Sequence, residues 1–162
     1  MHLCRFPLLL NELSRYGGDP LRLVSDFWRR DKPSWDHAIA MEEIGQAAFY
    51  DPDPRNPSRI RLPFQDASGG EIDPEAWTRW TAHDPVAIVD TRSENLRRMK
   101  LVYIDCGIKD QCNNLYGNRR FARKLAERRI PHVYEEFEDD HTAVDYRLDV
   151  SLPLVARALS AG

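Results

Sequence analysis

The sequence has 162 residues, of which 42% are hydrophobic and 30% charged, and its 26 acidic and 23 basic residues give a net charge of -3. This length and composition are typical of a globular chain of about one domain, and they exclude a disordered one. The near balance of charge gives no sign of the basic surface that a nucleic-acid-binding protein needs. No apolar run reaches the ~18–20 residues of a membrane span, and the apolar stretch at residues 6–10 is shorter than a signal-peptide core of ~7–15. We therefore expect a cytoplasmic protein with no nucleic-acid or membrane partner.

Up to about residue 98, helical patterns alternate with breaks that contain proline. Asp19-Pro20 and Asp73-Pro74 each place a helix-capping residue before a proline that suits the first helical position, so a helix is expected to follow each pair. Near-helical periodicity predicts a further helix over residues 34–50. Asp84-Pro85 predicts another helix start, and a separate helical stretch is expected over residues 93–99.

Beyond residue 98, strand-like and helical patterns alternate without long loops. The predicted elements are a strand at 100–105, a helix at 114–129, a strand at 132–137 and a helix at 142–159. Gly107 is expected to end the first strand, Pro131 to stop the first helix, and Pro153 to interrupt the second. This order is a βαβ unit, which predicts an α/β fold with two parallel strands and a right-handed crossover.

Acidic residues lie at or after the end of each predicted strand, and a histidine follows the second. Asp105 ends the first strand and Asp110 lies in the loop after it, and Asp139, Asp140 and His141 follow the second. Because parallel strands present their carboxyl ends at one edge of a sheet, an acid is expected to meet His141 there. A carboxylate bonded to one imidazole nitrogen makes the other nitrogen a better general base. Surface or packing roles are expected for the remaining histidines, His2, His37, His83 and His132.

Three segments in this region resemble one known family. The segment YIDCGIKDQ at 103–111 resembles the catalytic-acid loop of the esterase branch of the α/β-hydrolase superfamily, in which a strand ends in D-x-G-x-x-D. The segment at 130–141 is similar to the next strand and histidine loop of that family, and the segment at 145–153 resembles its closing helix. The resemblance covers about residues 85–160. Residues 16–82 resemble, more loosely, a helical insertion found in some members.

The resemblance implies a division of the chain and a role for each site residue. It implies that residues 85–162 are the C-terminal part of an α/β-hydrolase fold, and that residues 1–84 are a mostly helical, Trp-rich, cap-like insertion before it. It implies that Asp110 orients His141, the general base of a Ser-Asp-His triad that hydrolyses a small-molecule carboxylic ester. Asp105 is a second candidate acid, for which a structural hydrogen-bonding role is favoured, and Asp140 is expected to point away from the histidine. No metal or cofactor is implied.

The sequence departs from the family in one respect that decides activity. It contains no G-x-S-x-G nucleophile elbow, and the strands and oxyanion-hole donors that accompany the elbow are missing as well. We therefore expect an esterase-like C-terminal portion that is inactive alone, with a missing N-terminal half or a second copy of the chain as its partner.

Two other interpretations remain open. One is a non-catalytic α/β module that binds a partner or a small ligand through the same strand-end cleft. The other is a thiol enzyme using Cys106, which would need a depressed thiol pKa. The three cysteines, at positions 4, 106 and 112, have neither the number nor the spacing of a disulfide scaffold or a zinc motif.

Overall fold

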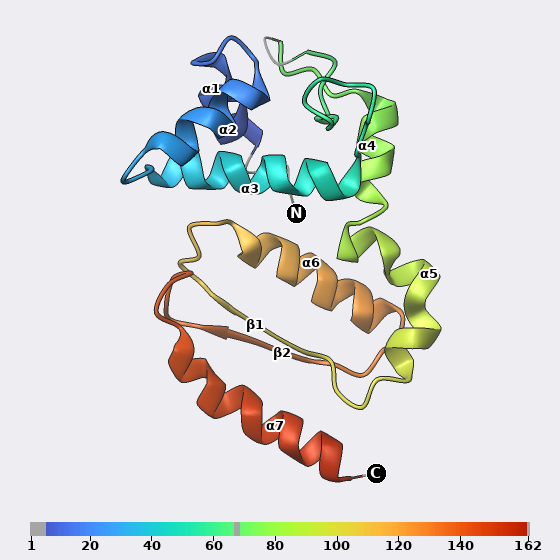
Figure 1. Ribbon diagram of the computed structural model, residues 1–162. Coiled ribbons are helices and arrows are strands. Elements are labelled where there is room, and N and C mark those ends of the chain that lie inside the picture. The colour runs from blue at the N-terminus through green and yellow to red at the C-terminus, as the bar shows by residue number, and fades with distance from the viewer. Residues whose placement is uncertain (1–5, 67–68, 162) are drawn as a thin grey trace. The chain divides into compact units, whose positions relative to one another are not determined.

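The computed structural model describes residues 6–66 and 69–161, and the chain divides into two compact units (Figure 1). We call residues 2–84 the helical unit and residues 85–162 the sheet unit. The chain is mostly helical with one small parallel sheet of two strands joined by a βαβ crossover, so it belongs to the α/β class. Among the described residues, no helix is both long enough and apolar enough to cross a membrane.

The helical unit is built from helices whose starts follow from local capping. Its helices are α1 (Phe6–Ser14), α2 (Pro20–Arg29), α3 (Trp35–Tyr50) and α4 (Pro74–Thr81). The side chains of Asp19 and Asp73 accept backbone N–H groups at the starts of α2 and α4, as the sequence predicts. Ser34 caps α3 in the same way, although that helix was predicted from its periodicity alone. Helix α1 was not predicted, because no capping signal marks its apolar run.

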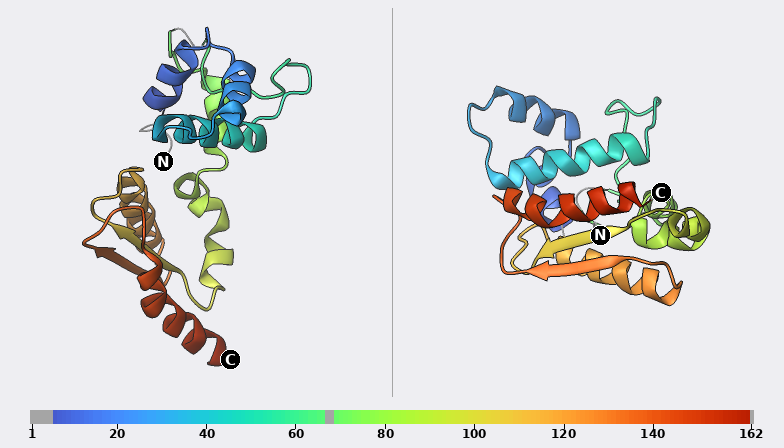
Figure 2. Two further views of the ribbon diagram at one scale, coloured as in Figure 1. Left: turned by 60° about the vertical axis from the view of Figure 1, so that its left-hand side comes forward. Right: turned by 90° about the horizontal axis from the view of Figure 1, so that it is seen from below.

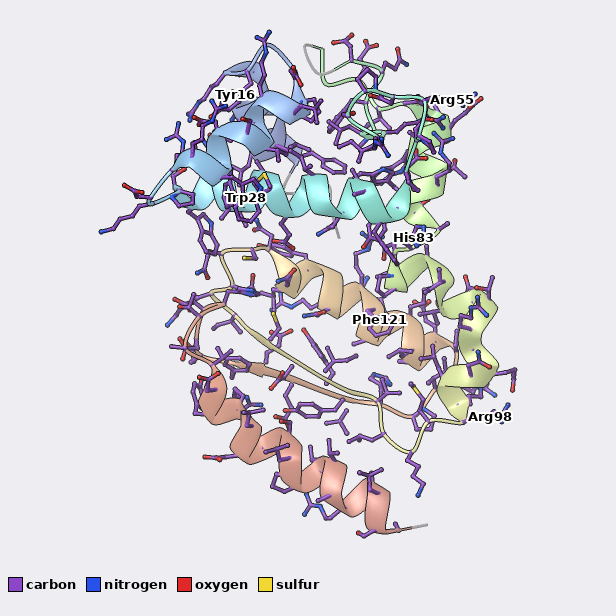
Figure 3. The ribbon with its side chains drawn as sticks, viewed as in Figure 1. Tyr16, Trp28, Arg55, His83, Arg98 and Phe121 are labelled. Carbon is purple, nitrogen blue, oxygen red and sulfur yellow. The ribbon has the colours of Figure 1, made fainter. Side chains whose placement is uncertain are left out.

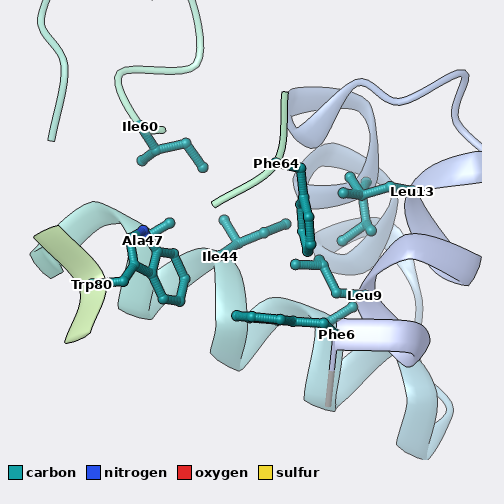
Figure 4. Packing of buried hydrophobic residues seen from close by; sticks show 10 residues of the cluster. Phe6, Leu9, Leu13, Ile44, Ala47, Ile60, Phe64 and Trp80 are labelled. Carbon is teal, nitrogen blue, oxygen red and sulfur yellow. The ribbon is translucent and has the colours of Figure 1, made fainter. Parts of the chain in front are cut away.

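One apolar cluster holds the helical unit together (Figure 4). The ring of Phe6 lies edge-on to the rings of Phe64 and Trp80, with centroids 5.1 and 5.8 Å away. Trp80 is fully buried, and its indole N–H donates to the carbonyl oxygen of Arg61 at 3.3 Å. The buried members of the cluster are Phe6, Leu9, Leu13, Leu23, Ala40, Ile44, Ala47, Ile60, Phe64 and Trp80. The cluster therefore joins all the helices of this unit to the irregular segment between α3 and α4.

The sheet unit has helices on both sides of its two strands. Its elements are α5 (Pro85–Arg97), β1 (Tyr103–Gly107), α6 (Asn114–Glu127), β2 (Val133–Phe137), the short 3-10 helix η2 (Asp145–Arg147) and α7 (Leu148–Ser160). The strands pair in parallel, from Tyr103 with Val133 to Gly107 with Phe137. Helices α6 and α7 lie on opposite sides of the sheet (Figures 1 and 2). Phe121 of α6, labelled in Figure 3, packs against the buried residues Val89, Leu125 and Ile130.

Several predicted boundaries in this unit were wrong. Helix α5 is continuous through Ser93, because the Ser93 hydroxyl donates to the Val89 carbonyl at 2.7 Å inside the helix instead of capping a new one. Strand β1 starts three residues later than predicted, but it ends at Gly107, as predicted. Helix α6 ends before Pro131, because Arg129 adopts a left-handed φ of 53° and closes the helix with a turn. Pro153 lies inside α7 and does not interrupt it.

Alternate residues of the strands face different partners. On the α6 side, Ile104 packs against the buried residues Val89, Leu125 and Ile130. On the same side, Arg119 of α6 donates two hydrogen bonds to Glu136 of β2, at 2.7 and 2.6 Å. This bidentate pair fastens α6 to β2.

The Arg119–Glu136 pair predicts acid sensitivity of the sheet unit. The hydrogen bonds from Arg119, followed by that from Tyr134, lower the pKa of Glu136 from 4.5 to about 2. A carboxyl group with a depressed folded-state pKa adds stability above its unfolded pKa and loses it as the pH falls toward the folded one. We expect hydrogen-exchange protection of the β2 amides, measured by NMR, to fall between pH 4.5 and pH 2.

Glu136→Gln should remove that part of the pH dependence. Glu138→Gln is the matched control, because Glu138 pairs with Lys109 at an exposed position. An unchanged acid dependence in Glu136→Gln would contradict the assignment.

Candidate functional site

The loops after β1 and β2 meet at the carboxyl edge of the sheet. The backbone N–H of Ile108 donates to the Phe137 carbonyl at 2.9 Å, and that of Lys109 donates to the Asp139 carbonyl at 3.0 Å. At Gly107 the loops approach so closely that an added Cβ would lie 2.2 Å from the carbonyl oxygen of Asp139. Only glycine fits at this position without moving the backbone that leads to His141.

Gly107→Ala is therefore expected to displace the loop that carries His141. Overpacking of this kind costs about 1–3 kcal/mol of unfolding free energy. The NMR signal of the His141 imidazole should also lose the signature of its hydrogen bond to Asp110. Gly45→Ala is a control, because Gly45 lies within α3 with no atom within 4 Å of an added Cβ. That control should be neutral or stabilising by about 0.5–1 kcal/mol, and equal effects of the two changes would refute the steric argument.

The structure brings the two predicted catalytic residues together. Asp110 Oδ2 lies 2.9 Å from His141 Nδ1, and the Asp110 side chain is 4% exposed whereas that of His141 is 46% exposed. Asp110 also accepts from the backbone N–H of Asn114 at 3.2 Å and from its side-chain amide at 3.4 Å. The backbone N–H of His141 donates to Gln111 Oε1 at 3.0 Å. Both members of the pair are thus held by neighbours as well as by each other.

The electrostatics of the pair fix the arrangement of its protons. Burial, the largest single influence, would raise the pKa of Asp110, but the hydrogen bonds from His141 and Asn114 together outweigh it and lower that pKa. Asp110 is therefore ionised at neutral pH, and an ionised carboxylate only accepts hydrogen bonds. The imidazole must then carry its proton on Nδ1, which leaves Nε2 as the basic nitrogen on a half-exposed side chain.

A small hollow of about 200 Å³ adjoins the pair. Its lining residues are Asp105, Cys106, Gly107, Asp110, Asn114, Asn118, Phe137, Asp140 and His141. None of these described lining residues is a serine. Burial raises the pKa of the Cys106 thiol, which is the opposite of what thiol catalysis requires.

The other two acids of these loops have different partners. Asp105 accepts from Arg147 at 3.0 Å and from the Tyr103 hydroxyl at 3.1 Å, so it tethers η2 to β1. Asp140 accepts from the backbone N–H and the hydroxyl of Thr142, at 2.6 and 2.8 Å, and these bonds lower its pKa. Neither carboxylate is the one that bonds the His141 ring.

Two residues that support the pair were not predicted. Asn114 bonds the Asp110 carboxylate, and Gln111 bonds the backbone of His141. The only sequence feature that could have indicated either of them is the position of Asn114 at the start of a predicted helix.

Cys112 lies close enough to the pair to form a set of possible metal ligands. Asp110, Cys112 and His141 place ligand atoms within 4.8 Å of one another. Carboxylate, thiolate and imidazole are the ligands that Zn²⁺ takes in proteins, so this set could hold that ion if Cys112 lost its proton.

Comparisons with known proteins do not assign the chain to a family. No protein-family model matches the chain, and no curated protein matches it. The functional argument therefore rests on the site geometry.

Proposed function

We propose that the sheet unit supplies the acid and base of an esterase-like α/β hydrolase, and that its serine nucleophile comes from outside these 162 residues. The observation that carries this proposal is the Asp110–His141 pair, which lies at the carboxyl ends of two parallel strands. Among the described residues, no hydrogen bond is made by the second ring nitrogen of His141. Active sites of open parallel sheets lie at that edge. In this proposal, the helical unit is the cap-like insertion of the hydrolase.

The pair would act by moving one proton. His141 Nε2 would take the proton from the serine hydroxyl as the serine attacks the ester carbonyl, and would then give it to the departing alcohol. Asp110 would hold the imidazole in orientation and stabilise its protonated form. Water would release the acid from the acyl-enzyme by the same proton transfers. No metal or cofactor takes part in these steps.

Exposed apolar residues and an unpaired strand edge in the sheet unit support the proposal that additional polypeptide packs against it. Four apolar residues of α7 are at least two-fifths exposed and follow helical spacing: Leu148, Leu152, Val155 and Leu159. Within the described residues, β1 pairs with a strand on one side only. Two-stranded sheets with uncovered apolar helices gain stability from added strands or a second copy.

The test is to express the chain together with the coding sequence that precedes Met1 and to measure p-nitrophenyl butyrate hydrolysis. We expect that sequence to encode an apolar strand followed by G-x-S-x-G, and the extended chain to hydrolyse the ester. The 162-residue chain should show no hydrolysis that depends on His141.

If no such elbow is encoded, the esterase proposal fails. The alternative is then a non-catalytic α/β module that binds a small ligand in the hollow beside His141.

A further inference from the structure

The helical unit contains a serine–histidine arrangement of its own. Ser34 is the N-cap of α3, and its Oγ lies 2.7 Å from Nδ1 of His37 in the first turn. The same Oγ accepts the backbone N–H of His37 at 3.3 Å. Ser34 is exposed, whereas His37 is 4% exposed. The prediction of a surface or packing role for His37 therefore misses the hydrogen bonds of its ring.

The partners on the far side of the ring fix its tautomer. The Tyr16 hydroxyl donates its one proton to Asp26 at 2.5 Å, so its oxygen must accept from His37 Nε2, 3.0 Å away. Glu12 Oε2 lies 3.4 Å from the same nitrogen. Nε2 therefore carries the proton, and Nδ1 is free to accept the proton of the Ser34 hydroxyl. Tyr16, labelled in Figure 3, follows α1 in the helical unit.

Two carboxylates lie near Nε2 of this imidazole. Glu12 is 1% exposed, and its Oε2 has no hydrogen-bond partner among the described residues. Asp26 acts through Tyr16, and its Oδ2 lies 3.9 Å from His37 Nε2. Arg15 pairs with Glu12 at 2.8 Å and Arg30 with Asp26 at 2.6 Å, so both acids have a cationic neighbour. Negative charge beside Nε2–H stabilises the imidazolium that forms when Nδ1 takes a proton.

We propose that Ser34 is a nucleophile for acyl transfer from small carboxylic esters, with His37 as its general base and Glu12 and the Tyr16–Asp26 pair as positioning groups. This site is separate from the Asp110–His141 pair and does not depend on the function proposed for that pair. The serine lies at the N-terminus of a 16-residue helix, where the first N–H groups have no partner within the helix. Those groups and the helix dipole favour negative charge, so they can stabilise the oxyanion that forms beside Ser34.

The proposed reaction balances within the site. Ser34 Oγ bonds to the ester carbonyl carbon while its proton moves to His37 Nδ1. Collapse of the tetrahedral intermediate breaks the bond to the leaving oxygen, which takes the proton from Nδ1 and departs as the alcohol. Water then attacks acyl-Ser34 by the same route, which releases the carboxylic acid and restores the serine.

The test uses p-nitrophenyl acetate with the purified 162-residue chain, followed by intact mass and peptide mapping. We expect a burst of one p-nitrophenol and one acetyl group per chain, located on Ser34. Ser34→Asn keeps an N-cap residue but removes the hydroxyl, so it should fold and lose the burst. Ser25→Ala is the matched control, because it changes an exposed serine of α2 and should keep the burst.

The role of His37 is tested by the acylation rate. His37→Gln should slow acylation by about 10²-fold or more, the usual contribution of a general base. Acetyl groups spread over other residues, or an equal burst from Ser34→Asn, would overturn the proposal. Neither result would affect the esterase proposal, because that proposal is tested by p-nitrophenyl butyrate hydrolysis in the extended chain.

Discussion

Replacing His141 with alanine in the extended chain is expected to lower kcat/KM for p-nitrophenyl butyrate by about 10⁴-fold or more. Loss of the base of a triad removes most of its rate enhancement, because the nucleophile and the acid cannot act without it. Asp110→Asn should cost about 10⁴-fold, because an asparagine in this place can favour the wrong imidazole tautomer. The measurement is steady-state kinetics, with circular dichroism to show that each variant is folded.

His132→Ala is the matched control for this experiment. Among the described residues, the His132 ring bonds only the carbonyl of Ile130, at 2.8 Å. His132 does not line the hollow beside His141. That variant should keep kcat/KM within a factor of a few. A loss of less than tenfold in His141→Ala would remove His141 from the chemistry and refute the proposed triad.

Asp105→Asn separates the two candidate acids. Asp105 bonds Arg147 and Tyr103 on the other face of the sheet, so its replacement should lower the stability of the sheet unit. It should change kcat/KM far less than Asp110→Asn does. The reverse order of effects would make Asp105 the orienting acid.

The meeting of an acid with His141 could be predicted from connectivity alone, whereas the choice of Asp110 over Asp105 came from the family resemblance. Two parallel strands joined by one helix place their following loops at one edge, whatever the side chains do in detail. The contacts that refine the site could not be predicted in this way. Asn114 and Gln111 bond the pair through particular rotamers, and the need for glycine at 107 depends on how closely two loops approach in space.

Helix starts were predicted where a local signal exists, and they were missed where packing decides. Asp19 and Asp73 cap their helices as their sequence context indicates, and the periodicity of residues 34–50 predicted α3. Helix α1 has no such signal, and burial of Phe6 and other apolar residues in the cluster stabilises it. The environment of His37 was missed for a related reason. The Ser34-x-x-His37 spacing is local, but Glu12 and Tyr16 reach the ring only through the tertiary fold.

Trp80→Ala is expected to lower the unfolding free energy of the helical unit by about 3–5 kcal/mol, the usual cost of deleting a buried large aromatic. Trp80 is fully buried, its ring lies 5.4 Å from that of Tyr50 and 5.8 Å from that of Phe6, and its N–H donates to the Arg61 carbonyl. The change leaves a cavity and also removes the donor to that carbonyl. All four tryptophans lie before residue 85, so urea unfolding followed by tryptophan fluorescence reports on this unit.

Trp28→Ala makes the same chemical change at a site that is 74% exposed, so it tests whether burial is the cause. It should cost no more than about 0.5 kcal/mol, the usual range for surface substitutions. Equal losses in the two variants would mean that Trp28 is covered in solution, by a second copy of the chain or by another partner. The loss for Trp28→Ala would then depend on protein concentration if the cover is a second copy, because association stabilises the folded state by mass action.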